Sequence, residues 1–257
     1  MSKLLGIFAH PLDESYMAGG TVAKYVKAGW KADLVCATRG EQGTWGEYQP
    51  ESGSTLAEIR QKELEEAAAM LGVGSVTFLD YKDGGLSSQS PGEIEDKIAA
   101  LLAVNKPDAV ITFEPSGITN HPDNIKLTLA TTFAFQKYAA DRYEADPEDK
   151  NPPKLYYACM PESIVRYFVK KKYIPNESFG RPWQGVEDKK ITTVIDVRRV
   201  SAVKEKALRI HKSQSEEIGQ YLEIPNNPFL SHEYFMLRYI GIAEVFMGKN
   251  DRVSDRL

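Results

Sequence analysis

The chain has 257 residues, a formal net charge of −4, 42% hydrophobic residues and 26% charged residues. This composition is that of an ordinary globular protein with enough apolar material for a core, and the length fits one large α/β domain or two small ones. No basic excess is present, so a nucleic-acid surface or an anionic-membrane surface is not expected, and a small-molecule partner is the better expectation.

The two cysteines, Cys36 and Cys159, are too few for a disulfide framework and form no CxxC pair. Both therefore indicate a reduced, cytoplasmic compartment. The apolar run within residues 1–9 is too short for a signal peptide and ends at a His-Pro pair. No apolar stretch approaches the roughly 20 residues that span a bilayer, so a soluble protein without a membrane span is expected.

The first half alternates short apolar runs with amphipathic segments. The clearest helix begins at Thr55, where Thr55 and Glu58 fit a capping box, and it stops before Gly72. Helices between strands predict a mainly parallel sheet with right-handed crossovers, in a single Rossmann-like α/β domain. Strands are expected over residues 3–9, 32–38, 75–79 and 108–113, and helices over residues 15–29, 55–71, 91–104 and about 122–138.

The second half is less regular. Residues 141–153 are polar and hold three prolines, which favours a loop. Residues 155–160 and 191–197 are expected as strands, and residues 200–213 as a helix. Residues 167–188 are rich in aromatic residues, lysine and proline, and two interpretations stay open: a lid, or a contact in a homo-oligomer.

Ligands of parallel α/β sheets bind beyond the carboxyl ends of the strands. This rule nominates the segments that follow the first four expected strands, namely residues 10–14, 39–46, 81–86 and 114–124. Nearly all residues with catalytic or metal-binding chemistry in this chain fall within them. The sequence therefore predicts one site at this edge of the sheet.

Two His-Asp pairs stand in these segments. His10 and Asp13 offer an imidazole and a carboxylate, a usual pair of zinc ligands, although the spacing alone favours a strand end and a helix cap. His121 and Asp123 fit a general acid with its orienting carboxylate, or a loop histidine before an acidic first helical turn. The chain has only four histidines, and two of them at strand ends favour a shared site.

Several short motifs follow one another in a fixed order along the chain. They are AHPLDES followed by GG, TRGEQG, IRQKELEEAAAMLGV, LDYKDGGL, GITNHPDN and a later HKSQ. In order and spacing, over about residues 3–215, the chain resembles the PIG-L/LmbE-type zinc-dependent N-acetylglucosaminyl deacetylases. The resemblance implies a mononuclear zinc site that removes an acetyl group from an N-acyl amino sugar of the N-acetylglucosamine type.

The resemblance also implies roles for individual residues. His10 and Asp13 would be metal ligands, and His121, oriented by Asp123, would stabilise the oxyanion or protonate the leaving amine. Arg60 and Asp83 would contact substrate hydroxyl groups. Without the family, an ion pair of Arg60 with Glu63 and a turn role for Asp83 are the favoured interpretations.

Two positions depart from the family pattern. Leu12 stands where the family has the aspartate that takes a proton from water, and Asn124 stands where it has the third zinc ligand, a histidine. Leucine cannot accept a proton, and losing a positioned base costs roughly 10²–10⁴-fold in rate. Asparagine is a neutral, weaker ligand. Zinc held by His10, Asp13 and Asn124 should therefore bind less tightly, and Mg²⁺ or Mn²⁺ should compete better.

Three interpretations of these departures stay open. The chain is an altered or redesigned member of the family, or a relative that binds a sugar without hydrolysing it, or a hydrolase in which another carboxylate is the base. Candidates for that carboxylate are Glu14, Glu41 and Asp123. A nucleotide-dependent enzyme is disfavoured, because the sequence contains neither GxGxxG after the first strand nor GxxxxGK[ST].

Overall fold

Five parallel strands form the centre of the sheet in the order β3-β2-β1-β4-β5. They appear in a computed structural model that describes residues 1–45, 48, 53–246 and 253–257. The strands are β1 (Lys3–Phe8), β2 (Lys31–Cys36), β3 (Ser75–Phe78), β4 (Ala109–Phe113) and β5 (Lys154–Cys159). The expected Rossmann-like, mainly parallel α/β sheet is thereby confirmed.

Antiparallel strands extend the sheet beyond β5. The long strand β9 (His232–Ile240) pairs with β5, and both β8 (Thr193–Asp196) and β10 (Ala243–Glu244) pair with β9. This sheet extension comes from the carboxyl-terminal part of the chain, in which β9 and β10 are not predicted from sequence patterns. It leaves the carboxyl ends of the parallel strands free for the site.

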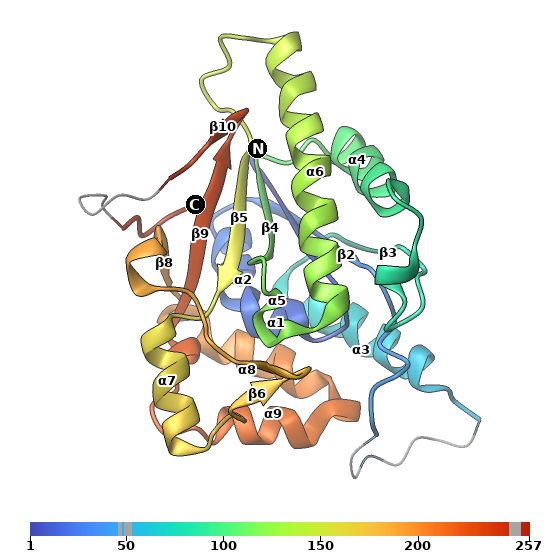
Figure 1. Cartoon of the computed structure of the whole chain (residues 1–257), viewed down its shortest axis with the longest axis vertical. Helices are drawn as coiled ribbons and strands as arrows, with labels where there is room; N and C mark the ends of the chain where they lie inside the picture. Colours follow the sequence, from blue (N-terminus) through green and yellow to red (C-terminus); the bar gives the residue numbers. More distant parts are fainter. Residues whose placement is uncertain (46–47, 49–52, 247–252) are drawn as a thin grey trace.

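Helices cover both faces of the sheet (Figure 1). The long helix α6 (Pro122–Ala145) packs with α4 (Glu93–Asn105) in front of the sheet in that view, and α2 (Gly19–Lys27) lies behind it. Helix α2 packs in turn against α3 (Leu56–Leu71) and α8 (Ser201–Ile210). The buried apolar strands between these layers form the core.

Short elements gather at the carboxyl ends of the parallel strands, at the bottom of Figure 1. They are α1 (Asp13–Met17), α5 (Gly117–Asn120), α7 (Glu162–Lys171), the hairpin of β6 (Glu177–Ser178) and β7 (Arg181–Pro182), and α9 (Ser215–Leu222). Five 3-10 turns complete the described elements: η1 (Leu86–Ser88), η2 (Asp188–Lys190), η3 (Arg198–Val200), η4 (Lys212–Gln214) and η5 (Pro228–Leu230).

Most expected elements are present, with two corrections. The helix expected over residues 15–29 is two helices, α1 and α2, that meet at Ala18, whose φ of −144° is not helical. The loop expected over residues 141–153 is wrong at its start, because α6 continues to Ala145. Residues 167–188 contain the end of α7 and the β6–β7 hairpin. Of the segment 39–46, Gly46 lies outside the described residues.

The start of α3 is held by the capping box that the sequence predicts. The Thr55 hydroxyl accepts a hydrogen bond from the Glu58 backbone amide, and the Glu58 carboxylate accepts one from the Thr55 amide at 2.9 Å. At the other end, Gly72 has a φ of 83°, the left-handed conformation that ends many helices.

Replacing the capping threonine tests this local account. Thr55→Ala removes the acceptor for an otherwise unpaired helix amide and should lower the free energy of unfolding by about 1 kcal/mol. Urea unfolding followed by circular dichroism measures the change. The matched control is Ser54→Ala, one residue outside the cap, which should stay within about 0.5 kcal/mol of the parent; equal effects of both variants would contradict the account.

A buried ion pair ties the carboxyl-terminal strand to the helical layer. The Glu233 carboxylate on β9 lies 2.7 Å from Lys204 Nζ on α8, and both side chains are at most 1% exposed. Glu233 also accepts hydrogen bonds from the backbone amides of Gly20 and Thr21 at the start of α2. Lys204 Nζ donates to the carbonyls of Tyr16 and Phe229 as well. The pair therefore joins β9, α2 and α8.

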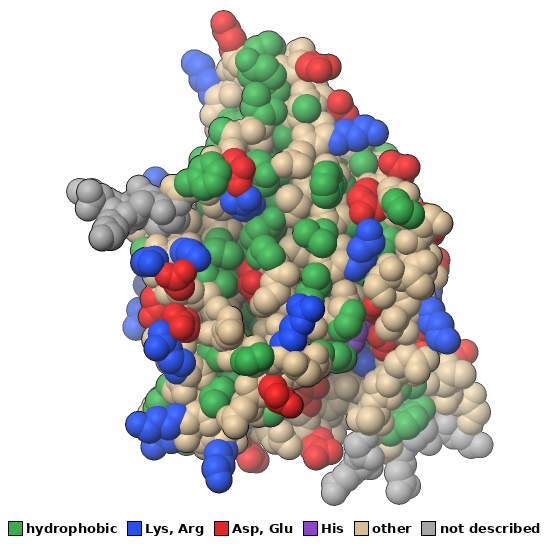
Figure 2. All heavy atoms as spheres, in the orientation of Figure 1, with side chains coloured by type: hydrophobic (Ala, Val, Ile, Leu, Met, Phe, Trp, Pro, Cys, Tyr) green, Lys and Arg blue, Asp and Glu red, His purple; other side chains and the backbone are tan. Residues whose placement is uncertain are grey.

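The surface carries scattered apolar side chains. On α6, Leu129 is 49% exposed and Phe133 is 65% exposed, and Figure 2 shows hydrophobic side chains along the face of the molecule that α6 occupies. Within the described ranges, no helix has the length and apolar character needed to cross a membrane.

Candidate metal centre and active site

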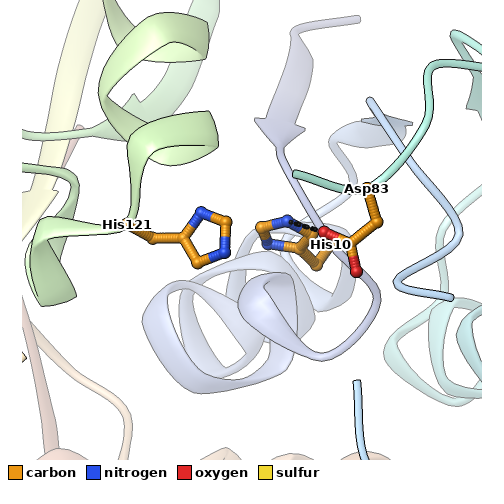
Figure 3. A group of neighbouring side chains, drawn as sticks. All are labelled: His10, Asp83 and His121. Atoms are coloured by element: carbon orange, nitrogen blue, oxygen red, sulfur yellow. Dashed lines mark ion pairs between the residues drawn. The ribbon is translucent and has the colours of Figure 1, made fainter. Parts of the chain in front are cut away.

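The candidate site lies where the strand order reverses. Strands β2 and β3 follow β1 on one side, and β4 and β5 lie on its other side, so the switch point falls between β1 and β4, where ligands of open α/β sheets bind. His10 follows β1, and His121 follows β4 and α5. Figure 3 shows the two imidazole rings facing one another, with Asp83 on the far side of His10.

His10 is surrounded by carboxylates. Its Nδ1 lies 3.4 Å from Asp13 Oδ2, and its Nε2 lies 3.0 Å from Asp83 Oδ1 and 3.5 Å from Asp123 Oδ2. Burial alone lowers the pKa of His10, but the nearby carboxylates of Asp123, Asp13 and Asp83 raise it well above its usual value. The surrounding carboxylates therefore stabilise a positive charge on the His10 ring.

The carboxylates on the Nε2 side are fixed by backbone amides. Asp83 accepts a hydrogen bond from the Gln42 amide, and the fully buried Asp123 accepts from the amides of Gly84 and Leu86. Burial raises the pKa of Asp83, but its hydrogen bond to His10 and the nearby positive charge outweigh this effect and lower the pKa to about 2. Asp83 therefore stays ionised beside His10.

His121 is held by the start of α6. As the N-cap residue, it accepts a hydrogen bond at Nδ1 from the Asp123 backbone amide at 3.1 Å. Its ring meets the His10 ring edge-on, with centroids 4.5 Å apart. Burial and the charge of His10 lower its pKa. A neutral imidazole that accepts at Nδ1 carries its proton on Nε2, so His121 is arranged as a hydrogen-bond donor.

Asp123 reaches His121 by a route that the sequence did not indicate. The expected contact was a carboxylate that orients the imidazole. In the structure the backbone amide of Asp123 contacts the ring, whereas its side chain holds the loop of Gly84 and Leu86 and lies near His10.

Two donor sets share His10. One consists of His10, Asp83 and His121, whose ligand atoms all lie within 4.8 Å of one another. The other is the set expected from the sequence, His10 with Asp13 and Asn124. The Asn124 amide nitrogen donates to the Gly117 carbonyl at 3.1 Å, and its buried Oδ1 has no hydrogen-bond partner among the described residues.

One distance in the second set suits a zinc ion. Two zinc ligands with bonds of about 2.0–2.2 Å lie roughly 3.4 Å apart in a tetrahedral site, and His10 Nδ1 and Asp13 Oδ2 are 3.4 Å apart. On the other side of the His10 ring, Asp83 lies beside Nε2. Carboxylates often contact the second ring nitrogen of a metal-binding histidine in this way. The unpaired Asn124 oxygen supplies a third donor. These donors are chemically suited to a zinc ion, and the set of His10, Asp83 and His121 offers a second arrangement.

Leu12 occupies a strained position in the first loop. Its φ of 97° is rare for any residue with a side chain, and asparagine or aspartate tolerates such values better than leucine does. The Leu12 side chain packs against Leu208 and Ile218 and is 4% exposed. Ile118, in the loop after β4, also has a positive φ of 64°. Backbone strain of this kind clusters at functional sites.

The three alternative carboxylate bases are already engaged. Glu14 is buried and accepts hydrogen bonds from the Leu12 amide and the Ser15 hydroxyl, and it lies 3.2 Å from His211 Nε2. Burial raises the pKa of Glu14, but the hydrogen bond and charge of His211 lower it overall. Glu41 accepts from the Asp83 amide, and Asp123 accepts from two amides as described. Each of them thus serves to shape a loop.

The Arg60 side chain is buried between the loops that follow β1 and β2. Its guanidinium donates to the carbonyls of Gly40 and Pro11 at 2.8 and 2.7 Å, and its buried Nε has no partner among the described residues. A Cβ atom at Gly40 would lie 2.5 Å from the Arg60 guanidinium, so that glycine is required. The alternative partner Glu63 accepts instead from the amide and hydroxyl of Ser213. The HKSQ motif is therefore linked to α3, a contact that the sequence did not indicate.

The comparisons with known proteins identify the family of this chain. A family model described as GlcNAc-PI de-N-acetylase, PIG-L, matches residues 5–135. The chain is 31% identical to 1D-myo-inositol 2-acetamido-2-deoxy-alpha-D-glucopyranoside deacetylase from Rhodococcus erythropolis, over 98% of this chain and 96% of the relative. This chain belongs to the PIG-L family. A deacetylase of the same name from Thermomonospora curvata is 31% identical over 88% of this chain and 85% of its own length.

Solved structures show that this PIG-L protein has the fold of its relatives. N,N'-diacetylchitobiose deacetylase from Pyrococcus horikoshii matches with a TM-score of 0.64 and 22% identity, over 94% of this chain and 85% of that one. The 4-carboxy-2-hydroxymuconate hydratase GalB from Pseudomonas putida KT2440 matches with a TM-score of 0.66 and 18% identity, over 96% and 100%. Proteins named for two different reactions share the fold, so the reaction must be argued from the site.

Proposed function

We propose that this PIG-L protein is a zinc-dependent hydrolase of N-acyl amino sugars, of the N-acetylglucosaminyl deacetylase type, with a rate reduced by Leu12 and Asn124. The observation that carries the proposal is the pair of His10 Nδ1 and Asp13 Oδ2, 3.4 Å apart at the topological switch point. The names of its curated relatives support the class of substrate. A cytoplasmic location and a homo-oligomeric state belong to the same proposal.

His10, Asp13 and Asn124 would hold the metal. Zinc supplies a Lewis acid that polarises an amide carbonyl and makes water a better nucleophile near neutral pH. Asp83 holds the Nε2 side of His10, and the protein thereby sets which nitrogen faces the metal. A neutral amide oxygen from Asn124 in place of an imidazole weakens the site.

His121 would act as the proton donor in this chain, and Asp123 would position its ring. The Nε2–H of His121 can donate to the developing oxyanion or to the leaving amine, and the Asp123 amide fixes the ring that does so. Leu12 has no group to take the proton of the attacking water. The slow step in this chain is therefore proton removal from water.

Arg60 and Asp83 are proposed to contact the substrate hydroxyl groups. The unpaired Nε of Arg60 is a buried donor that a substrate oxygen would satisfy. Asp83 is 8% exposed, and its carboxylate already contacts His10 and the Gln42 amide. Asp83 would therefore position His10 and expose only a small part of its carboxylate to the substrate.

Metal content distinguishes ligands from positioning residues. Asp13→Ala removes a ligand and should abolish retention of zinc, whereas Asp83→Asn removes a positioning carboxylate and should weaken zinc affinity by about 10–100-fold. Elemental analysis after dialysis and a competitive chelator titration measure both. If Asp83→Asn loses all zinc while Asp13→Ala keeps it, the ion sits instead on the set of His10, Asp83 and His121.

A second candidate function is sugar or ligand binding without turnover. The buried apolar packing of Leu12 favours it, because this side chain is part of a small cluster with Leu208 and Ile218. An altered or redesigned member of the family would give the same site. Turnover of an N-acyl glucosamine by the zinc-loaded protein, above that of a His121→Ala variant, would reject the non-catalytic alternative.

A further inference from the structure

An apolar cavity of about 320 Å³ opens beside the proposed metal ligands. Asp13 and Asn124 both line it, so the cavity and the metal centre share a wall. Its other walls come from α1, the end of β4 and the loop after it, the residue after β5, α7 and the segment after it, the residue after β7, α9 and η5. They include Ile118, Met160, Ile174, Trp183, Tyr221 and Phe229.

Most side chains in the walls of this cavity are apolar, so a sugar ring is not the occupant that fits it best. Apart from Asp13, Thr119, Asn124, Glu217 and Gln220, the described lining residues carry apolar or aromatic side chains. The hydroxyl groups of Tyr16 and Tyr221 and the Trp183 indole N–H have no partner among the described residues, which leaves a few isolated polar groups. A pyranose ring carries several hydroxyl groups, and burying them without partners is costly.

A second, polar cavity offers a better place for the sugar. It measures about 250 Å³ and is lined by Thr44, Ser213, Gln214, Glu216, Glu217 and Gln220. Glu217 and Gln220 line both cavities. A substrate with a polar part and an apolar part can therefore extend from one cavity into the other, past these two side chains.

We propose that the apolar cavity binds the acyl chain of the substrate, and that this chain is longer than acetyl. The inference rests on the proposed hydrolase function and names its substrate class, N-acyl amino sugars with an apolar acyl chain. In the reaction, water oxygen bonds to the acyl carbon, the C–N bond breaks, the amine takes up a proton, and a fatty acid anion leaves. The volume is within the range of small-molecule pockets, and an acetyl methyl group fills only a small part of it.

Binding to the unaltered, zinc-supplemented protein tests the proposal without requiring turnover. Isothermal titration with N-acetyl-, N-butanoyl- and N-hexanoylglucosamine should give a dissociation constant that decreases about fourfold for each added methylene group. The hexyl glycoside of N-acetylglucosamine carries its chain on the other side of the sugar and should bind like N-acetylglucosamine. Equal affinities across the N-acyl series, or an equal gain for the hexyl glycoside, would overturn the assignment.

A variant that fills the cavity supplies the matched control. Ile174→Trp narrows the cavity and should remove the gain with chain length, and an unchanged circular dichroism spectrum shows that the protein remains folded. Ile242→Trp introduces the same side chain at a position that is 53% exposed and outside the cavity, and it should keep the gain. Loss of the gain in both variants, or in neither, would contradict the proposal.

The proposed function is judged separately. The double variant Leu12→Asp, Asn124→His should hydrolyse N-hexanoylglucosamine with a higher kcat/KM than N-acetylglucosamine. If that variant binds zinc and stays inert on every N-acyl sugar while the gain in binding persists, the hydrolase proposal fails and the cavity remains a binding site for the acyl chain. A preference for N-acetylglucosamine in turnover would overturn the inference and leave the hydrolase proposal standing.

Discussion

Replacing Leu12 by aspartate and Asn124 by histidine together is expected to raise turnover of an N-acyl glucosamine by at least roughly 10²–10⁴-fold. The aspartate restores a group that takes the proton of the attacking water, and the histidine restores a strong third zinc ligand in place of a neutral amide. Release of free amine, measured with zinc in slight excess, gives the rate. The backbone at position 12 favours the change, since a φ of 97° suits aspartate better than leucine.

The matched control for the first prediction is Leu12→Asn combined with Asn124→His. Asparagine has the size of aspartate and also tolerates a positive φ, but it cannot act as a base near neutral pH. This variant should bind zinc as tightly as the Leu12→Asp double variant and remain about as slow as the parent with zinc. Equal activity of both double variants would show that the residue at position 12 takes no proton in this protein.

Replacing Glu233 by alanine is expected to lower the free energy of unfolding by about 3–5 kcal/mol, because it leaves the charge of Lys204 buried and unpaired. The same change leaves the amides of Gly20 and Thr21 without an acceptor. Urea unfolding followed by tryptophan fluorescence measures the loss.

An exposed ion pair provides the control for the second prediction. Glu187 pairs with Lys189 and Lys190 at the surface, where such pairs contribute at most about 1 kcal/mol. Glu187→Ala should therefore change stability far less than Glu233→Ala. A loss of under about 1 kcal/mol for Glu233→Ala would mean that β9, α2 and α8 are held together by apolar packing alone.

Local patterns were sufficient to predict the parallel half of the fold. Apolar runs of five to seven residues gave β1 to β4, and the capping box and the terminal glycine gave α3 nearly to the residue. The break at Ala18 was missed because the amphipathic pattern continues across it. The end of α6 was missed because nothing before Pro147 forbids a helix. Strand β9 alternates buried and half-exposed residues but also contains Glu233, whose burial depends on Lys204 from another element.

The location of the site could be predicted from the sequence, but most of the contacts between its residues could not. The positions of His10 and His121 follow from strand ends and from the order of the motifs, which sequence displays directly. The contact of Asp83 with His10 joins residues 73 positions apart and depends on how two loops fold back over the sheet edge. The engagement of Arg60 with backbone carbonyls likewise requires the tertiary arrangement of Gly40 and Pro11. The apolar cavity is assembled from segments spread from Asp13 to Phe229 and has no signature in any one of them.

The zinc content of the purified, unaltered protein is the first measurement to make, because the proposed function depends on a metal held by His10, Asp13 and Asn124. The protein is incubated with zinc, dialysed, and analysed for metal alongside an Asp13→Ala variant. We expect near-stoichiometric zinc in the parent and none in the variant, if His10, Asp13 and Asn124 form the site as proposed. A parent protein that retains no zinc, or a variant that retains as much as the parent, would contradict it.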